Sequence, residues 1–256
     1  VSRLFGRGFE NYPEIPTTEA IGMTGNMQAA EETGAQIGRG LTSIGVNIDF
    51  APVADINSNP ANNVIGNRSF SSSPDIVSNM SFAFSKGLNR EGVLSVFKHF
   101  PGHGDTQGDS HDESVFIEAD INRLHSIEYK PFINAIDNDA EFILMGHISA
   151  PNVDSSGLPA SLSSYFMTDL LRTELGFKGI IITDAMDMGA ITDNYTSSQA
   201  SVLSFKNGAD IILMPKDYQE AREGMIAAVE SGEIPIQRLD ESVKRILGIK
   251  VKYNII

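Results

Sequence analysis

Short apolar runs rich in β-branched residues alternate along this chain with longer segments of helical periodicity, and this alternation constrains the fold most. Five runs predict strands: 46–53, 93–97, 142–145, 179–183 and 209–214. Helices are predicted over 18–41, 74–90, 121–136, 161–175, 197–206, 218–231 and 239–247. Strands that recur at spacings of roughly 30 to 50 residues, with helices between them, pair in parallel through right-handed crossovers. We therefore expect an α/β fold on a parallel sheet.

The number of strands is small for the length of the chain. The 256 residues are typical of a single α/β barrel, and no repeat or linker divides them. Only five strands are visible, however, and nothing before Val46 predicts a strand followed by a crossover helix. The expectation is one domain over 1–256 with a TIM-type (β/α) barrel that lacks its first one or two strands in this chain, or an open form of it.

Composition excludes several classes of partner and chemistry. The net charge is −14 and no Lys or Arg cluster is present, which argues against nucleic acid and anionic membranes as partners. No apolar run reaches the roughly 18 residues that span a bilayer. The absence of Cys excludes disulfides and thiol nucleophiles, but it leaves the compartment open between cytoplasm, cell envelope and secretion.

One glycine-rich segment concentrates the polar chemistry of the chain. Lys98–His111, KHFPGHGDTQGDSH, holds three of the five histidines and directly follows the predicted strand at 93–97. Glycines allow backbone conformations that are closed to other residues, so polar groups of such a loop can turn toward a ligand. In alternating α/β proteins, active sites form at the carboxyl ends of the strands.

Four predicted strand ends deliver polar residues: Asp55, Lys98 with His99, His147, and Asp184. One such residue is often a helix cap or an ion-pair partner, whereas four converging ends indicate a site. Asp184 ends the run IIIT, so its carboxylate is the candidate nucleophile; the alternative is an N-cap of the following helix. Asp187, three residues on, is the better candidate for that capping role.

Asp109 and His111 are two residues apart in the glycine-rich loop. A carboxylate at this spacing can accept the imidazole N–H and leave the other ring nitrogen to transfer protons near neutral pH. The alternative is a solvated surface loop. A metal site built from His99, His103, Asp109 and His111 is a third possibility, but no metal-ligand spacing is present and Lys98 would place a positive charge beside the cation.

Four motifs in order, APVADI (51–56), IGNRSF (65–70), KHFPGHG with DSH (98–111) and TDAMDMGAI (183–191), resemble glycoside hydrolase family 3. Within it, they are most similar to bacterial β-N-acetylglucosaminidases of the NagZ type. The resemblance implies a TIM-type catalytic barrel and a retaining reaction. Family members usually carry two further strands and an acidic Gly-Gly segment before the position of VSRL, so we expect this domain to be incomplete at its N-terminus, with a further domain possible outside this chain.

The resemblance also implies roles for individual residues. Asp184 matches the nucleophile, His111 the general acid/base and Asp109 its partner. Positions that hold the sugar hydroxyls match Asp55, Arg68, Lys98 and His99, and we group His147 with these substrate contacts because its strand end converges on them. No cofactor or metal is implied, and the expected partner is a small carbohydrate.

The resulting expectation is a retaining exo-β-N-acetylglucosaminidase that acts on peptidoglycan fragments or short amino-sugar oligosaccharides. Three alternatives remain: a phosphorylase that uses the same site, a sugar-binding barrel without turnover, and a metal-dependent hydrolase. The absence of Trp favours a short pocket over a long polysaccharide cleft, because flat aromatic side chains commonly stack on sugar rings in such clefts.

Overall fold

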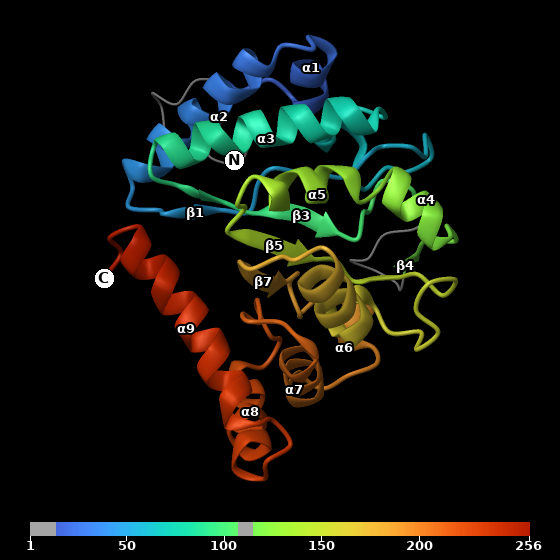
Figure 1. Cartoon of the computed structure of the whole chain (residues 1–256), viewed down its shortest axis with the longest axis vertical. Helices are drawn as coiled ribbons and strands as arrows, with labels where there is room; N and C mark the ends of the chain where they lie inside the picture. Colours follow the sequence, from blue (N-terminus) through green and yellow to red (C-terminus); the bar gives the residue numbers. More distant parts are fainter. Residues whose placement is uncertain (1–13, 107–114) are drawn as a thin grey trace.

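The computed structural model describes residues 14–106 and 115–256, and all strand pairs in these ranges are parallel, as predicted (Figure 1). The strands are β1 (Ile48–Asp49), β2 (Leu94–Ser95), β3 (Phe97–Phe100), β4 (Val115–Phe116), β5 (Phe142–Met145), β6 (Ile148–Ser149) and β7 (Ile180–Thr183). They form three small sheets with the orders β1-β2, β3-β5-β7 and β4-β6. The described residues therefore contain a parallel α/β arrangement but no closed barrel.

Two isolated bridges connect the β3-β5-β7 sheet to the segment after β1 on one side and to the segment around Ile211 on the other. Val53 bridges Lys98, and Ile182 bridges Ile211, both in parallel. The order in space thus follows the order in the chain, as it does for neighbouring strands of a barrel. The predicted strand at 209–214 is wrong as a regular strand, because the backbone around Ile211 pairs only locally and the Leu213 N–H donates to the Thr183 hydroxyl rather than to a carbonyl, at 3.0 Å.

Two of the predicted helices are each interrupted. The segment 18–41 forms α1 (Thr18–Met23) and α2 (Met27–Thr42), because Gly25 has a positive φ of 59° and the Asn26 side chain caps α2. The segment 121–136 forms α4 (Ile121–Ser126) and α5 (Lys130–Asp137), and Pro131 lies in the first turn of α5.

The predicted helix at 74–90 is confirmed with the same ends, and the remaining predicted helices are present with shifted ends. These helices are α3 (Pro74–Arg90), the π-helix η3 (Tyr165–Glu174), α7 (Ser197–Asn207), α8 (Tyr218–Glu230) and α9 (Ile236–Lys252), joined by the short helices η1 (Gly66–Arg68), η2 (Ala160–Leu162) and α6 (Gly189–Thr192). In Figure 1, α1, α2 and α3 form a layer at one end of the molecule, and α9 runs from beside β1 along the side of the molecule toward α8 at the other end.

Both faces of the central sheet are buried, which explains its continuous apolar runs. Phe97, Ile143 and Ile181 point to one face and pack against a core that includes Phe132 of α5 and Phe166 of η3. The alternate residues of β5 and β7 belong to a second cluster, on which Ile246 and Ile249 of α9 pack together with Tyr253, which follows α9. The sheet is thus held between layers, and its carboxyl edge is left for polar residues.

Candidate active site at the carboxyl ends of the strands

The carboxyl ends of β3, β5 and β7 lie at one edge of the sheet and bring the predicted residues together. Asp184 directly follows β7, and its N–H donates to the Met145 carbonyl at the end of β5, at 2.8 Å. Lys98 and His99 lie inside β3, not beyond it as predicted, because the Ala54 N–H donates to the Lys98 carbonyl and extends the parallel pairing. The sequence therefore predicts the correct edge but ends this strand three residues early.

A buried aspartate holds His99. Asp55 is fully buried; one carboxylate oxygen accepts the backbone N–H groups of His99, at 3.1 Å, and His103, at 2.7 Å. The other oxygen lies 2.6 Å from His99 Nδ1. Burial raises the pKa of Asp55, but the positive charge and hydrogen bonds of His99 and His103 outweigh it and lower the pKa to about 2.

This arrangement fixes the orientation of His99. Because the Asp55 carboxylate is ionised, Nδ1 of the His99 ring carries the proton and Nε2 is left as the second polar atom of the ring. Both carboxylate oxygens of Asp55 already form hydrogen bonds with His99 or His103. Its predicted influence on sugar hydroxyls would therefore act through the histidine.

The environment of Asp184 favours an ionised carboxylate. Its Oδ1 accepts the N–H of Ala185 at 2.8 Å. Burial raises the pKa of Asp184, but the electrostatic influence of His99 and His147, the Ala185 N–H and the Lys98 ammonium together lower it below the ordinary value. The next helix, α6, begins at Gly189 after Met188 as N-cap, without a side-chain cap, so the capping alternative does not apply to Asp184.

His147 is buried beside Asp184 rather than open to a ligand. It is 1% exposed, its Nδ1 lies 2.7 Å from the Ser161 hydroxyl, and its Nε2 lies 2.9 Å from the Ala185 carbonyl. Both ring nitrogens are thus engaged by the protein. The structure brings His147 to the site, as predicted, but in a place where it contacts the backbone next to Asp184.

Lys98 and Arg68 line a cavity of about 360 Å³ beside the strand ends, together with Asp49 and Phe70. Burial, followed by repulsion from Arg68, lowers the pKa of Lys98. Arg68 Nη1 donates to the Val64 carbonyl at 3.2 Å, which anchors the guanidinium. A cavity of this size, lined by two cations, one carboxylate and a mixture of polar and apolar side chains, suits part of a small polar ligand.

Asp109 and His111 lie outside the described residues, so their predicted pairing stays a prediction. The structure does describe how the start of their loop is anchored. The Asn62 side chain donates to the His103 carbonyl at 2.7 Å, and the Thr106 hydroxyl lies 2.7 Å from His103 Nδ1. Sequence reasoning missed Asn62 and Thr106, because a buried polar side chain in a loop has no periodic signature.

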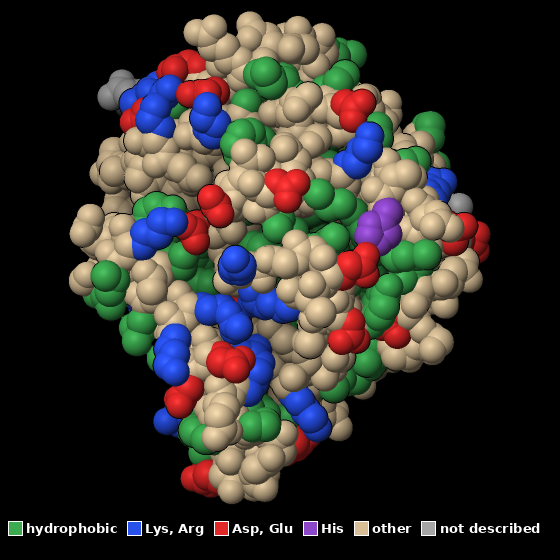
Figure 2. All heavy atoms as spheres, viewed as in Figure 1, with side chains coloured by type: hydrophobic (Ala, Val, Ile, Leu, Met, Phe, Trp, Pro, Cys, Tyr) green, Lys and Arg blue, Asp and Glu red, His purple; other side chains and the backbone are tan. Residues whose placement is uncertain are grey.

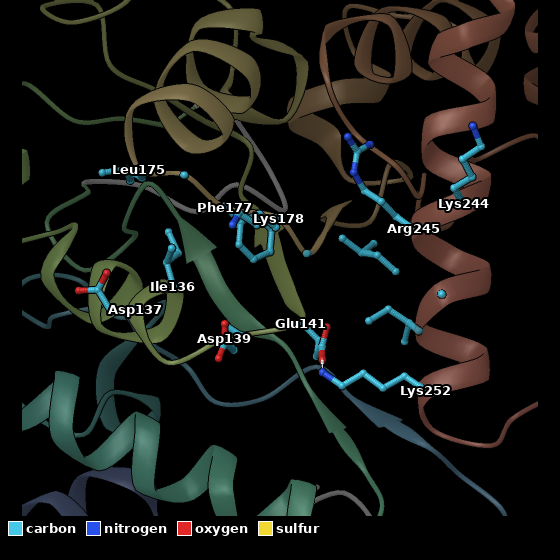
Figure 3. A pocket seen from close by; sticks show the side chains of 16 residues that line it. Ile136, Asp137, Asp139, Glu141, Leu175, Phe177, Lys178, Lys244, Arg245 and Lys252 are labelled. Carbon is cyan, nitrogen blue, oxygen red and sulfur yellow. Dashed lines mark hydrogen bonds and ion pairs between the residues drawn. The ribbon is translucent and has the colours of Figure 1, made fainter.

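A larger cavity, of about 650 Å³, lies away from these strand ends, between α9, α5 and the residues that precede β5 and β7 (Figure 3). Figure 3 shows Lys252 of α9 reaching Glu141, with which it forms an ion pair, and Glu141 also accepts the Tyr253 hydroxyl at 3.1 Å. None of the carboxylates that line this larger cavity directly follows a strand, as Asp184 does. We therefore place the candidate site at the carboxyl edge.

The described residues offer neither a metal cluster nor a membrane-spanning helix. Within 14–106 and 115–256, no group of three or more His, Asp or Glu side chains is arranged to hold a metal ion. In the same ranges, no helix combines the length and apolar character needed to cross a membrane.

Known proteins with similar sequences and structures agree with the motifs. The model of the glycosyl hydrolase family 3 N terminal domain matches residues 4–249. Beta-hexosaminidase A of Pseudoalteromonas piscicida is 35% identical over 269 residues, which cover 93% of this chain and 45% of that protein.

Two solved structures extend the comparison. A glycoside hydrolase family 3 β-N-acetylglucosaminidase from Paenibacillus sp. str. FPU-7 is 37% identical with a TM-score of 0.93, over 95% of this chain and 47% of its own. Beta-glucoside phosphorylase BglX is 29% identical with a TM-score of 0.92, over 96% and 46%. The chain thus spans about half the length of these relatives. Its motifs, its family match and these similarities together identify it as a member of glycoside hydrolase family 3.

Proposed function

We propose that this domain belongs to a retaining exo-β-N-acetylglucosaminidase that releases terminal N-acetylglucosamine from peptidoglycan fragments or short amino-sugar oligosaccharides. The observation that carries the proposal is Asp184, whose carboxylate follows β7, accepts the Ala185 N–H and is held ionised beside His99 and Lys98. The names of the hexosaminidase and acetylglucosaminidase relatives support the same substrate class.

The reaction would proceed in two displacements. The Asp184 carboxylate attacks the anomeric carbon as the glycosidic C–O bond breaks, and His111 donates its proton to the departing oxygen. His111 then takes a proton from water, which attacks the glycosyl-enzyme and releases both the sugar and Asp184. Imidazole suits both steps because its unperturbed pKa of about 6.5 lies near neutral pH. Asp109 would orient His111 through the ring N–H.

The other predicted site residues supply binding. Lys98 and Arg68 border the cavity beside the strand ends and can donate hydrogen bonds to sugar hydroxyls. His99, oriented by Asp55, offers its Nε2. Lys98 and Arg68 are assigned to sugar binding, whereas Asp55 acts through the orientation of His99. We therefore expect the replacement of either cation to raise KM more than the replacement of Asp55 does.

The nucleophile is tested by Asp184→Asn, which keeps the size of the side chain and removes its charge. We expect loss of at least about a thousandfold in kcat on an aryl N-acetyl-β-glucosaminide, because covalent catalysis needs the carboxylate. Asp187→Asn, an exposed change three residues on, is the matched control and should keep its rate. Both measurements use the full-length protein, with Tm recorded to confirm folding. Activity above a tenth of wild type in Asp184→Asn would remove the central assignment.

Phosphorolysis is the second candidate, and the similarity to a β-glucoside phosphorylase favours it. Phosphate would replace water in the second displacement, and a neutral histidine as acid/base repels an anion less than a carboxylate does. Product analysis with and without phosphate separates the two: free sugar indicates hydrolysis, and sugar 1-phosphate indicates phosphorolysis. Sugar binding by calorimetry without either product would instead indicate a non-catalytic barrel.

The parallel sheets support a proposal about the barrel itself. The sequential order of the strands and the TM-scores above 0.9 against longer family 3 structures are both consistent with an incomplete TIM-type barrel. In this interpretation, segments outside the described residues would complete the barrel beside β1. The full-length protein is therefore the sample for every activity measurement.

A further inference from the structure

His147 lies between β5 and β6, and its ring contacts two other segments of the chain. Nε2 lies 2.9 Å from the carbonyl of Ala185, the residue after the proposed nucleophile. Nδ1 lies 2.7 Å from the hydroxyl of Ser161 in η2. The ring is almost completely buried, so a sugar in the cavity beside Lys98 has no direct access to it.

The contacts determine where the proton of the His147 ring lies. A carbonyl oxygen can only accept, so Nε2 must carry the proton that it donates to Ala185. Burial lowers the pKa of His147 and keeps the ring neutral, which makes Nδ1 an acceptor for the Ser161 hydroxyl. Ser161 is itself held, since its N–H donates to the Gly146 carbonyl at 3.2 Å.

Both backbone polar groups of Ala185 form hydrogen bonds. Its N–H donates to Asp184 Oδ1 at 2.8 Å, and its carbonyl accepts from His147. The N–H and the carbonyl of Ala185 belong to successive peptide planes that meet at its Cα, so a hydrogen bond to each restricts the φ and ψ rotations that would turn one plane relative to the other. The direction in which the Asp184 carboxylate points therefore depends on His147.

We propose that His147 and Ser161 form a positioning pair that orients the carboxylate of Asp184 through Ala185, and that His147 does not contact the substrate. The inference rests on the proposed role of Asp184 as nucleophile. It assigns to His147 a role different from the sugar contact that the sequence predicts. A nucleophile that is misplaced by a fraction of an ångström loses rate in the bond-forming step while the sugar still binds.

The test compares His147→Ala with His147→Gln in the full-length protein. Alanine removes the donor to Ala185, so we expect kcat to fall about 10- to 100-fold with KM within about threefold of wild type. Glutamine places an amide N–H near the position of Nε2 and should recover most of the rate. Ser161→Ala should cause a smaller loss, because the Ala185 carbonyl still favours the same tautomer.

A matched control removes a buried hydroxyl elsewhere. Ser85→Ala breaks the 2.6 Å contact between Ser85 and Ser95, far from Ala185 in the chain, and should leave kcat unchanged. If KM rises in His147→Ala while kcat stays at its wild-type value, His147 is a substrate contact and the proposal is wrong. A kcat within twofold of wild type in that variant overturns it as well.

A second readout separates this proposal from the proposed function. The carboxyl ¹³C signal of Asp184, assigned with Asp184→Asn, can be titrated without substrate. Lys98 and His99 on β3 face it in every variant, whereas the His147 imidazole, which also lowers the pKa of Asp184, is absent from both His147 variants, so the comparison of His147→Ala with His147→Gln isolates the contact to Ala185. Loss of the His147 contact weakens the Ala185 N–H bond, so the pKa of Asp184 should rise in His147→Ala. A rise without turnover in wild type keeps the positioning role and rejects the glycosidase, whereas an unchanged titration rejects the positioning pair.

Discussion

Two buried aspartates, Asp55 and Asp210, stabilise opposite parts of this molecule through different partners. Asp55 at the carboxyl edge accepts from imidazole and backbone N–H groups. Asp210 accepts from Arg172 at 2.5 Å, Arg245 at 3.0 Å and the Ser242 hydroxyl at 2.5 Å. Imidazole changes its charge near neutral pH and guanidinium does not. The two clusters therefore differ in the chemistry of their donors, which are guanidinium groups at Asp210 and an imidazole with backbone N–H groups at Asp55.

The Asp210 cluster ties together three elements. Arg172 comes from η3, Arg245 from α9, and the N–H of Ile181 in β7 donates to the same carboxylate at 3.0 Å. Arg238 adds a third guanidinium at 3.6 Å. Figure 2 shows Lys and Arg side chains gathered over the region in which Figure 1 places α9, although the whole chain carries a net charge of −14.

The largest effect on stability should come from Asp210→Ala. The change leaves three guanidiniums close together, two of them largely buried, without their shared carboxylate. Removal of one partner of a buried ion pair costs about 3–5 kcal/mol in the free energy of unfolding. Urea unfolding measures the loss, and Asp169→Ala, an exposed change on η3, is the control. A loss below about 1 kcal/mol would show that the cluster does not join η3 to α9, since exposed pairs have this value.

Asp55→Asn should be less destabilising and more damaging to activity. Asparagine keeps an acceptor for the backbone N–H groups of His99 and His103, so we expect a stability loss of about 2 kcal/mol. Its amide nitrogen, however, would face His99 Nδ1 and favour the other tautomer of the ring, with a fall in kcat/KM of about a hundredfold. The same two assays apply to both aspartate variants. Equal losses of stability without a change in rate would remove the distinction between the two clusters.

The sequence predicts one of these clusters and not the other. Asp55, Lys98, His99 and Asp184 stand at the ends of apolar runs, and parallel strands bring such ends to one edge, so the site follows from strand order alone. Asp210 follows Ala209, at the start of a predicted strand. Its partners Arg172 and Arg245 are 38 and 35 residues away in the chain. The periodicity of the sequence does not indicate which arginine pairs with which aspartate.

The errors in the predicted elements have two different causes. The family and the parallel pairing follow from motifs and from alternation, both of which are local. The break between α1 and α2 carries a local turn and capping signal at Gly25 and Asn26, but it lies within an otherwise helical pattern. The burial of His147 has no local signal, because it depends on Ser161 and Ala185, which come from distant segments of the chain.

A more limited effect, confined to low pH, is expected on acid stability, which depends on the ionised carboxylate of Asp55. The pKa of Asp55 in the folded protein, about 2, lies below the value near 3.9 expected in the unfolded chain. A group with a depressed pKa stabilises the fold above its unfolded pKa, and this contribution is lost as the pH falls from about 4 toward 2. We expect the loss to approach about 2 kcal/mol, measured by urea unfolding across this range. In Asp55→Asn the group no longer titrates, so this part of the acid limb should be flatter than in wild type. Identical acid limbs in the two proteins would mean that the ionised carboxylate of Asp55 is not what holds His99 in place.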